Sequence, residues 1–153
     1  MRSTARPLRL LPDANVILSG MRFTGPPFWL LEEARAGRVM LVAPEYVLRE
    51  TRRILLRKFA LTDAAIDGGL AELPLAILPN PPVALLVRAQ MVIQDRADAP
   101  ILAAAWEASV DALVTGDAHF FTPAVQAKLR VITPREALDL ITARQSESGT
   151  QHP

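Results

Sequence analysis

Residues 8–17 read LRLLPDANVI, an apolar run that stops abruptly at Pro12 and Asp13. Proline cannot donate a hydrogen bond to a neighbouring strand, so Pro12 suits the last residue of a strand better than its middle. We therefore expect a short buried strand over residues 8–11, with Asp13 at its carboxyl end. Asp13-Ala-Asn15 is also typical of a turn that enters a helix.

The rest of the chain alternates short apolar runs with amphipathic stretches. We expect further strands at residues 39–43, 75–78, 112–115 and 130–133. We expect helices at 28–36, 44–59, 98–108 and 134–144 and one that begins near Thr62, whereas 83–93 fits a helix or a strand. This alternation predicts an α/β fold: a three-layer α/β/α sandwich around a mostly parallel sheet, with helices on both faces. We predict a single domain over residues 1–144 and a disordered polar tail over 145–153.

Composition excludes several classes of protein. The chain has 153 residues, 50% of them hydrophobic and 22% charged, which excludes a disordered chain. The absence of cysteine excludes disulfide frameworks, zinc–thiolate sites, iron–sulfur clusters and cysteine nucleophiles. The apolar runs are too short to span a membrane, and no secretory signal follows the basic start of the chain. We expect a cytoplasmic protein that does not associate with a membrane.

Two acidic residues fall on the apolar faces of predicted helices. Glu50 follows Val47 by three residues and precedes Ile54 by four, which places it on the apolar stripe of its helix. Asp98 precedes Ile101, Leu102 and Ala105 by three, four and seven residues, which places it on the apolar face of its helix. An ionised carboxylate that faces a core costs several kcal/mol unless a cation or hydrogen-bond donors compensate it. Both placements therefore need an explanation.

Two further acids, Asp13 and Asp117, each follow a predicted strand of the same sheet. Active sites of such sheets lie beyond the carboxyl ends of the strands. Together with Glu50 and Asp98 they would form a group of four carboxylates, which repel one another unless a divalent cation lies between them. Mg²⁺ or Mn²⁺ suits such a site, because both ions prefer oxygen ligands.

Each acid also has a purely structural explanation. Asp98 precedes Ala-Pro and fits a helix N-cap, and Asp117 follows Thr-Gly and fits a turn. Glu50 fits a surface ion pair with Arg53 or Arg57. One shared metal site explains all four placements at once, whereas these explanations need a separate reason for each acid.

Four motifs occur in a characteristic order along the chain. They are Leu11-Pro-Asp13-Ala-Asn15-Val-Ile, the helical Glu50, Asp98-Ala-Pro-Ile-Leu-Ala-Ala-Ala105 and Val114-Thr115-Gly-Asp117. In this order and at these intervals they resemble the PIN domain family, and most closely its VapC-like branch, the toxin components of toxin–antitoxin systems. The resemblance extends over about residues 8–140.

The resemblance implies an α/β/α sandwich and a nuclease that uses Mg²⁺ or Mn²⁺ and usually acts on RNA. The implied catalytic residues, which are also the metal ligands, are Asp13, Glu50, Asp98 and Asp117. The implied supporting residues are Asn15 and Thr115, with Asp95 as an outer acid. Many relatives carry a second acid just after the last one, where this chain has Ala118-His119. That difference puts a second metal position in doubt.

Substrate contacts are expected beside the acids. Arg49, Arg52 and Arg53 lie on the helix that carries Glu50, and they fit either a phosphate-contacting edge or a solvated helix face. His119 fits a contact with a substrate phosphate or a solvated loop position.

The expected function is hydrolysis of RNA phosphodiester bonds by a metal-dependent endoribonuclease, with RNA as substrate. As a toxin it would form a homodimer and bind a small cognate antitoxin. The alternatives are a PIN-like module that binds RNA or protein with weak or no turnover, and a housekeeping RNA-processing nuclease.

Overall fold

The computed structural model describes residues 6–150, and within this range the strands form one parallel sheet. The strands are β1 (Arg9–Pro12), β2 (Met40–Pro44), β3 (Leu75–Leu78), β4 (Ala112–Val114) and β5 (Val131–Ile132). Their order across the sheet is β3-β2-β1-β4-β5, and every neighbouring pair runs parallel. The predicted α/β fold is confirmed, and the sheet is more uniform than the expected mostly parallel one.

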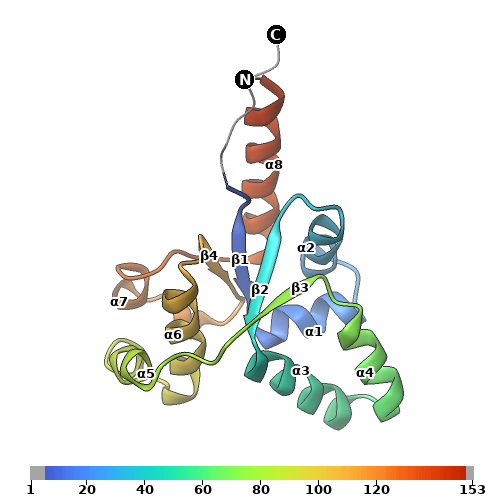
Figure 1. Ribbon diagram of the computed structural model, residues 1–153, viewed down its shortest axis with the longest axis horizontal. Coiled ribbons are helices and arrows are strands. Elements are labelled where there is room, and N and C mark those ends of the chain that lie inside the picture. Colours follow the sequence, from blue (N-terminus) through green and yellow to red (C-terminus); the bar gives the residue numbers. More distant parts are fainter. Residues whose placement is uncertain (1–5, 151–153) are drawn as a thin grey trace.

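Helices cover both faces of this sheet. They are α1 (Ala14–Arg22), α2 (Pro26–Arg35), α3 (Glu45–Lys58), α4 (Asp63–Ala71), α5 (Val83–Gln90), α6 (Ala99–Ala108), α7 (Pro123–Gln126) and α8 (Pro134–Thr150). Helices α5, α6 and α7 lie on one side of the sheet, while α1, α2 and α8 cover the other and α3 and α4 continue beyond α1 (Figure 1). This arrangement is the predicted three-layer sandwich.

The strands are buried on both faces. Leu10 and Leu41 pack with α2 and α8, whereas Leu11 and Leu113 point to the opposite face and pack with α6. None of these four side chains is more than 1% exposed. Burial of each contributes about 1.5–3 kcal/mol to folding, so the alternating leucines hold the three layers together.

The order of the strands determines where a ligand can bind. β1 pairs with β2 on one side and with β4 on the other, and its register sets Leu11 beside Leu113 and Pro12 beside Val114. From β1 the chain continues to β2 and β3 on one side of β1, and it then crosses to β4 on the other side. Such a change of side opens a crevice beyond the carboxyl ends of β1 and β4. Asp13 and Asp117, which follow β1 and β4, both lie at this crevice.

The last helix is longer than the sequence predicts. We expect it to end near residue 144, with a disordered tail over 145–153, but α8 continues to Thr150. The prediction is therefore wrong for 145–150, and 151–153 lie outside the described residues. The tail was inferred from its polar composition, which an exposed helix shares. No helix in the described part of the chain has both the length and the hydropathy needed to cross a bilayer.

Candidate active site

Asp13 is held at the end of β1 by hydrogen bonds to both carboxylate oxygens. Its Oδ1 accepts from the backbone N–H of Val16 at 2.9 Å and so caps α1, while its Oδ2 accepts from the hydroxyl of Thr115. The side chain is buried, with 8% of the residue exposed. Burial raises the pKa of Asp13 above its ordinary value, and the bonds from Thr115 and Val16 act in the opposite direction. The carboxylate is thus fixed in one orientation.

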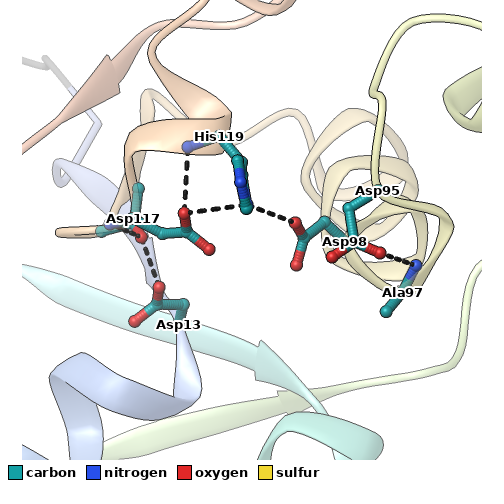
Figure 2. A network of polar contacts seen from close by, with 7 residues as sticks. Asp13, Asp95, Ala97, Asp98, Asp117 and His119 are labelled. Atoms are coloured by element: carbon teal, nitrogen blue, oxygen red, sulfur yellow. Dashed lines mark hydrogen bonds and ion pairs between the residues drawn. The ribbon is translucent and has the colours of Figure 1, made fainter.

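Thr115 connects the ends of β1 and β4. Its hydroxyl donates to Asp13, and its Oγ1 accepts from the backbone N–H of Asp117 at 3.0 Å. Thr115 is completely buried. Asp117 in turn accepts from the backbone N–H of His119 at 2.9 Å and so begins a short 3₁₀ turn over Ala118–Phe120. Asp117 therefore fills the predicted structural role and lies beside Asp13 at the same time (Figure 2).

Asp98 stands at the start of α6 but does not cap it. Its side chain makes no capping hydrogen bond, and its Oδ2 is buried without a hydrogen-bond partner among the described residues. Asp95 makes a cap nearby, accepting from the backbone N–H of Ala97 at 2.9 Å. Burial, and then the charges of Asp117 and Asp95, raise the pKa of Asp98 to about 6. The N-cap explanation therefore does not account for this carboxylate.

His119 lies between two of the acids. Its Nδ1 is 3.3 Å from Oδ1 of Asp117 and 3.8 Å from Oδ2 of Asp98 (Figure 2). Within the described residues, Asp95, Asp98 and His119 form a group of three in which each offers a potential ligand atom within 4.8 Å of the other two. This side chain thus adds a nitrogen donor to a site that is otherwise built from carboxylates.

Glu50 reaches the site from α3 as half of an ion pair. Arg53 donates to it from Nη2 at 2.6 Å and from Nε at 3.1 Å. The surface ion pair considered as an alternative is therefore present. Both residues nevertheless line the same pocket as Asp13 and Asp98, although the Glu50 side chain is 41% exposed.

The pocket has a volume of about 400 Å³ and is lined by residues that follow β1, β2 and β4, among them Asp13, Tyr46 and Phe120. Its polar lining consists of Asp13, Asn15, Tyr46, Glu50, Arg53 and Asp98. Asp117, Thr115, His119 and Asp95 border it through the contacts described above without lining it. Three of the four predicted acids thus share one pocket, and the fourth lies next to it.

Tyr46 belongs to this site, although the sequence patterns do not single it out. It precedes Glu50 by one helical turn on α3 and lines the pocket. Burial, and then the charges of Asp98, Asp13 and Glu50, raise the pKa of its hydroxyl. The spacing of four residues from Glu50 is the signal that identifies it, because such neighbours share a helix face.

Arg49 and Arg52 are not brought to the acids. They line a separate pocket between α3 and α4. Arg52 pairs with Asp67 at 2.8 Å and with Asp63 at 3.7 Å, and Arg49 lies 4.0 Å from Glu45. Of the three predicted arginines, the structure places Arg53 alone at the acid pocket.

The carboxylates fit a divalent cation. Asp98 keeps a buried oxygen without a donor, and Asp117 and Asp95 add like charge around it. Such an arrangement is unfavourable without a positive partner, and its oxygen donors are those that Mg²⁺ and Mn²⁺ prefer. Among the described residues, Asp95, Asp98 and His119 have potential ligand atoms within 4.8 Å of one another, while Asp13 and Glu50 line the same pocket as Asp98.

Comparison with known proteins gives one family and several similar structures. The family model described as PIN domain matches residues 9–119. No curated protein matches the chain. The crystal structure of PAE2754 from Pyrobaculum aerophilum has a TM-score of 0.64 at 19% identity, covering 89% of this chain and 90% of that one. FitAB bound to an IR36 DNA fragment has a TM-score of 0.58 at 20% identity, over 82% of this chain and 94% of that one. The crystal structure of FitAcB from Neisseria gonorrhoeae has a TM-score of 0.56 at 20% identity, covering 82% of this chain and 98% of that one. At these identities the similarity establishes the fold.

Proposed function

Because the chain belongs to the PIN domain family, we propose that it is a metal-dependent endoribonuclease that hydrolyses RNA phosphodiester bonds with Mg²⁺ or Mn²⁺. The observation that carries the proposal is the gathering of Asp13, Glu50 and Asp98 in one pocket beside Asp117. Their chain positions are far apart, and the sheet brings them together at the crevice where ligands of such folds bind.

The protein's own residues hold and orient the site. Asp13, Glu50, Asp98 and Asp117 would ligate the cation, and Thr115 fixes Asp13 by its hydrogen bond. When bound, the cation supplies an activated water and neutralises charge on the reacting phosphate. Asn15 lines the pocket and would act as a supporting polar group, and Asp95, whose carboxylate lies within 4.8 Å of the ligand atoms of Asp98 and His119, would act as an outer acid.

Substrate contacts follow from the position of the bases. Arg53 is 57% exposed at the pocket, where it can bind a phosphate of the RNA. Its pairing with Glu50 does not prevent this, because exposed ion pairs contribute at most about 1 kcal/mol. His119 is positioned to contact a phosphate or a cation beside Asp98.

Two substitutions test the catalytic assignment. Asp13→Asn and Asp117→Asn each remove a negative charge from the site, and we expect both to abolish Mg²⁺- or Mn²⁺-dependent cleavage of a single-stranded RNA. Asp139→Asn, an exposed position on α8, serves as control and should cleave at the rate of the unmodified chain. Circular dichroism checks that each variant is folded. Undiminished cleavage by both site variants would refute the proposal.

A binding module without turnover is the second candidate. It is favoured by His119, which stands where many relatives are expected to carry another acid. Calorimetric titration with Mn²⁺ followed by an RNA cleavage assay separates the two. Metal binding without cleavage indicates the module, and metal-dependent cleavage indicates the enzyme.

The biological role is proposed from the VapC-like resemblance. We propose a cytoplasmic toxin that forms a homodimer and is inhibited by a small cognate antitoxin that covers the acid pocket. Induced expression should stop growth, and co-expression of a short neighbouring reading frame should restore it. Growth that is unaffected by induction indicates a housekeeping RNA-processing nuclease instead.

A further inference from the structure

The acid pocket is built for more than a cation. Its volume of about 400 Å³ falls in the range of sites that bind small molecules. Beside the carboxylates it has an apolar lining contributed by α3, α6 and the turn after β4: Val47, Ile54, Pro100, Ile101 and Phe120. A hydrated cation gains nothing from contact with such side chains.

Acidic and apolar residues of the pocket lie close together at two helices. Asp98 immediately precedes α6, on which Pro100 and Ile101 lie two and three residues further, and on α3 Val47 precedes Glu50 by three residues. Val47 and Ile101 are buried, with 0% and 5% exposed, so they form a floor whose shape is fixed by the core. If the carboxylates hold one group of a ligand, the adjoining part of that ligand therefore lies over Val47 and Ile101.

Tyr46 forms the side of the apolar part. It is partly buried, and its hydroxyl has no hydrogen-bond partner within the described range. The surrounding carboxylates of Asp98, Asp13 and Glu50 disfavour its ionisation. Tyr46 therefore presents an aromatic ring and a neutral O–H donor to whatever enters the pocket.

We propose that the apolar part of the pocket is a nucleobase subsite, in which Tyr46 stacks on a base next to the phosphodiester that the acids engage. This inference rests on the proposed function. The base and the phosphate belong to one nucleotide, so a site that engages the phosphate holds the base a short distance away. Aromatic stacking accepts any base, and a base can reach the subsite when it is released from a duplex. The substrate is therefore single-stranded or looped RNA.

The test measures binding rather than cleavage. The probes are two single-stranded RNA oligonucleotides of equal length, one with 2-aminopurine at a central position and one with an abasic site there, in Mn²⁺. The protein carries Asp117→Asn, which removes turnover and leaves the lining of the pocket intact. The variants are Tyr46→Ala, Tyr46→Phe and, as an exposed aromatic outside the pocket, Trp29→Ala.

We expect Tyr46→Ala to weaken binding of the intact probe by at least about fivefold and to abolish the change in 2-aminopurine fluorescence. The protein that keeps Tyr46 should bind the abasic probe more weakly than the intact probe, by a similar factor. Tyr46→Ala should not weaken binding of the abasic probe further, since both changes remove the same contact. Tyr46→Phe keeps the ring and should retain binding of the intact probe, and Trp29→Ala should have no effect.

Equal affinity for the intact and abasic probes, or additive effects of Tyr46→Ala and the abasic site, would overturn the subsite. If the unmodified chain still cleaves RNA, that outcome leaves the proposed function standing. If neither probe binds and no RNA is cleaved, the proposed function fails and the subsite fails with it. Comparison of the intact and abasic probes on the protein that keeps Tyr46 tests the subsite even if Tyr46→Ala does not fold.

Discussion

Asp98 lies in an environment that differs strongly from that of an ordinary surface acid. One carboxylate oxygen is buried without a donor, and the neighbouring Asp117 and Asp95 add negative charge. The consequence is that the pKa of Asp98 lies near 6 instead of near 3.8. In the absence of a cation the folded protein therefore holds an unfavourable charge at neutral pH.

Replacement of Asp98 by Asn should stabilise the metal-free protein at pH 7.5 but not at pH 4. The raised pKa means that the folded state keeps a proton which the unfolded chain loses as pH rises from about 4 to 6, so stability falls over this interval. A shift of this size corresponds to about 3 kcal/mol, which solvent screening at the partly exposed Asp98 reduces to about 1 kcal/mol.

Urea unfolding in EDTA at the two pH values measures this difference, and Asp139→Asn is the control. Equal free energies of unfolding for Asp98→Asn and the unmodified chain at pH 7.5 would contradict the expected strain at Asp98.

The sequence predicts some of these residues and misses others for identifiable reasons. Helix faces and strand ends predict Asp13, Glu50 and Asp98, because periodicity indicates which way a side chain points. The sequence does not single out Tyr46, because an aromatic side chain at helical spacing is ordinarily part of a core. The separation of Arg52 from Arg53 depends on Asp67 of α4, a tertiary contact that no local pattern contains.

At the scale of elements, α1 and α2 pack closely against each other at Gly20. Gly20 lies on α1, and a Cβ placed there would come 2.7 Å from Cδ1 of Leu31 and 2.9 Å from the backbone oxygen of Pro27. Gly68 on α4 has no atom within 4 Å of such a Cβ. Gly20 and Gly68 are therefore both helical glycines, but the first is crowded by a neighbouring helix and the second is not.

Alanine substitutions at these glycines should have opposite effects on stability. In an open helix position alanine is favoured over glycine by about 1 kcal/mol, so Gly68→Ala should raise the free energy of unfolding. Gly20→Ala should lower it by about 1–3 kcal/mol, because the backbone oxygen of Pro27 cannot move aside without shifting α2. Equilibrium unfolding in urea measures both, and a stabilising Gly20→Ala would show that the two helices are not closely packed.

Most elements follow from the sequence, and the exceptions have physical causes. β3 (Leu75–Leu78) matches its predicted bounds, whereas the ambiguous segment 83–93 becomes α5 (Val83–Gln90). A short apolar run suits a helix or a strand equally, and packing against α6 decides between them. The four-residue α7 carries too little periodicity to be predicted.

For the whole molecule, the formal net charge of +1 conceals an uneven distribution. Acids gather in the pocket, and the bases of α3 divide between two sides of that helix. Arg53 lies at the acid pocket, while Arg52 is directed to α4 and paired there. Of these two arginines, Arg53 is therefore the one that could contact a phosphate bound near the acids.

Salt dependence of RNA binding should distinguish the two arginines. Each phosphate contact on a single strand contributes about 0.7 to the slope of log affinity against log salt. In the Asp117→Asn background, Arg53→Gln should reduce that slope by about this amount, and Arg52→Gln, which removes the same charge, should leave it unchanged. Titration of a fluorescent RNA at several salt concentrations measures the slope. Equal slopes for the two variants would mean that the general charge of the surface governs binding.

The pairing of β1 with β4 joins parts of the chain that are made far apart in time. Thr115 and the Asp13 that it fixes are separated by 102 positions, and α3 with Glu50 lies between them. During synthesis β1 therefore waits with one edge unpaired until β4 leaves the ribosome, and contacts of such long range form slowly. The pocket therefore cannot be completed on the nascent chain before β4 and the residues that follow it have been translated, because Thr115 and Phe120 belong to that part of the chain.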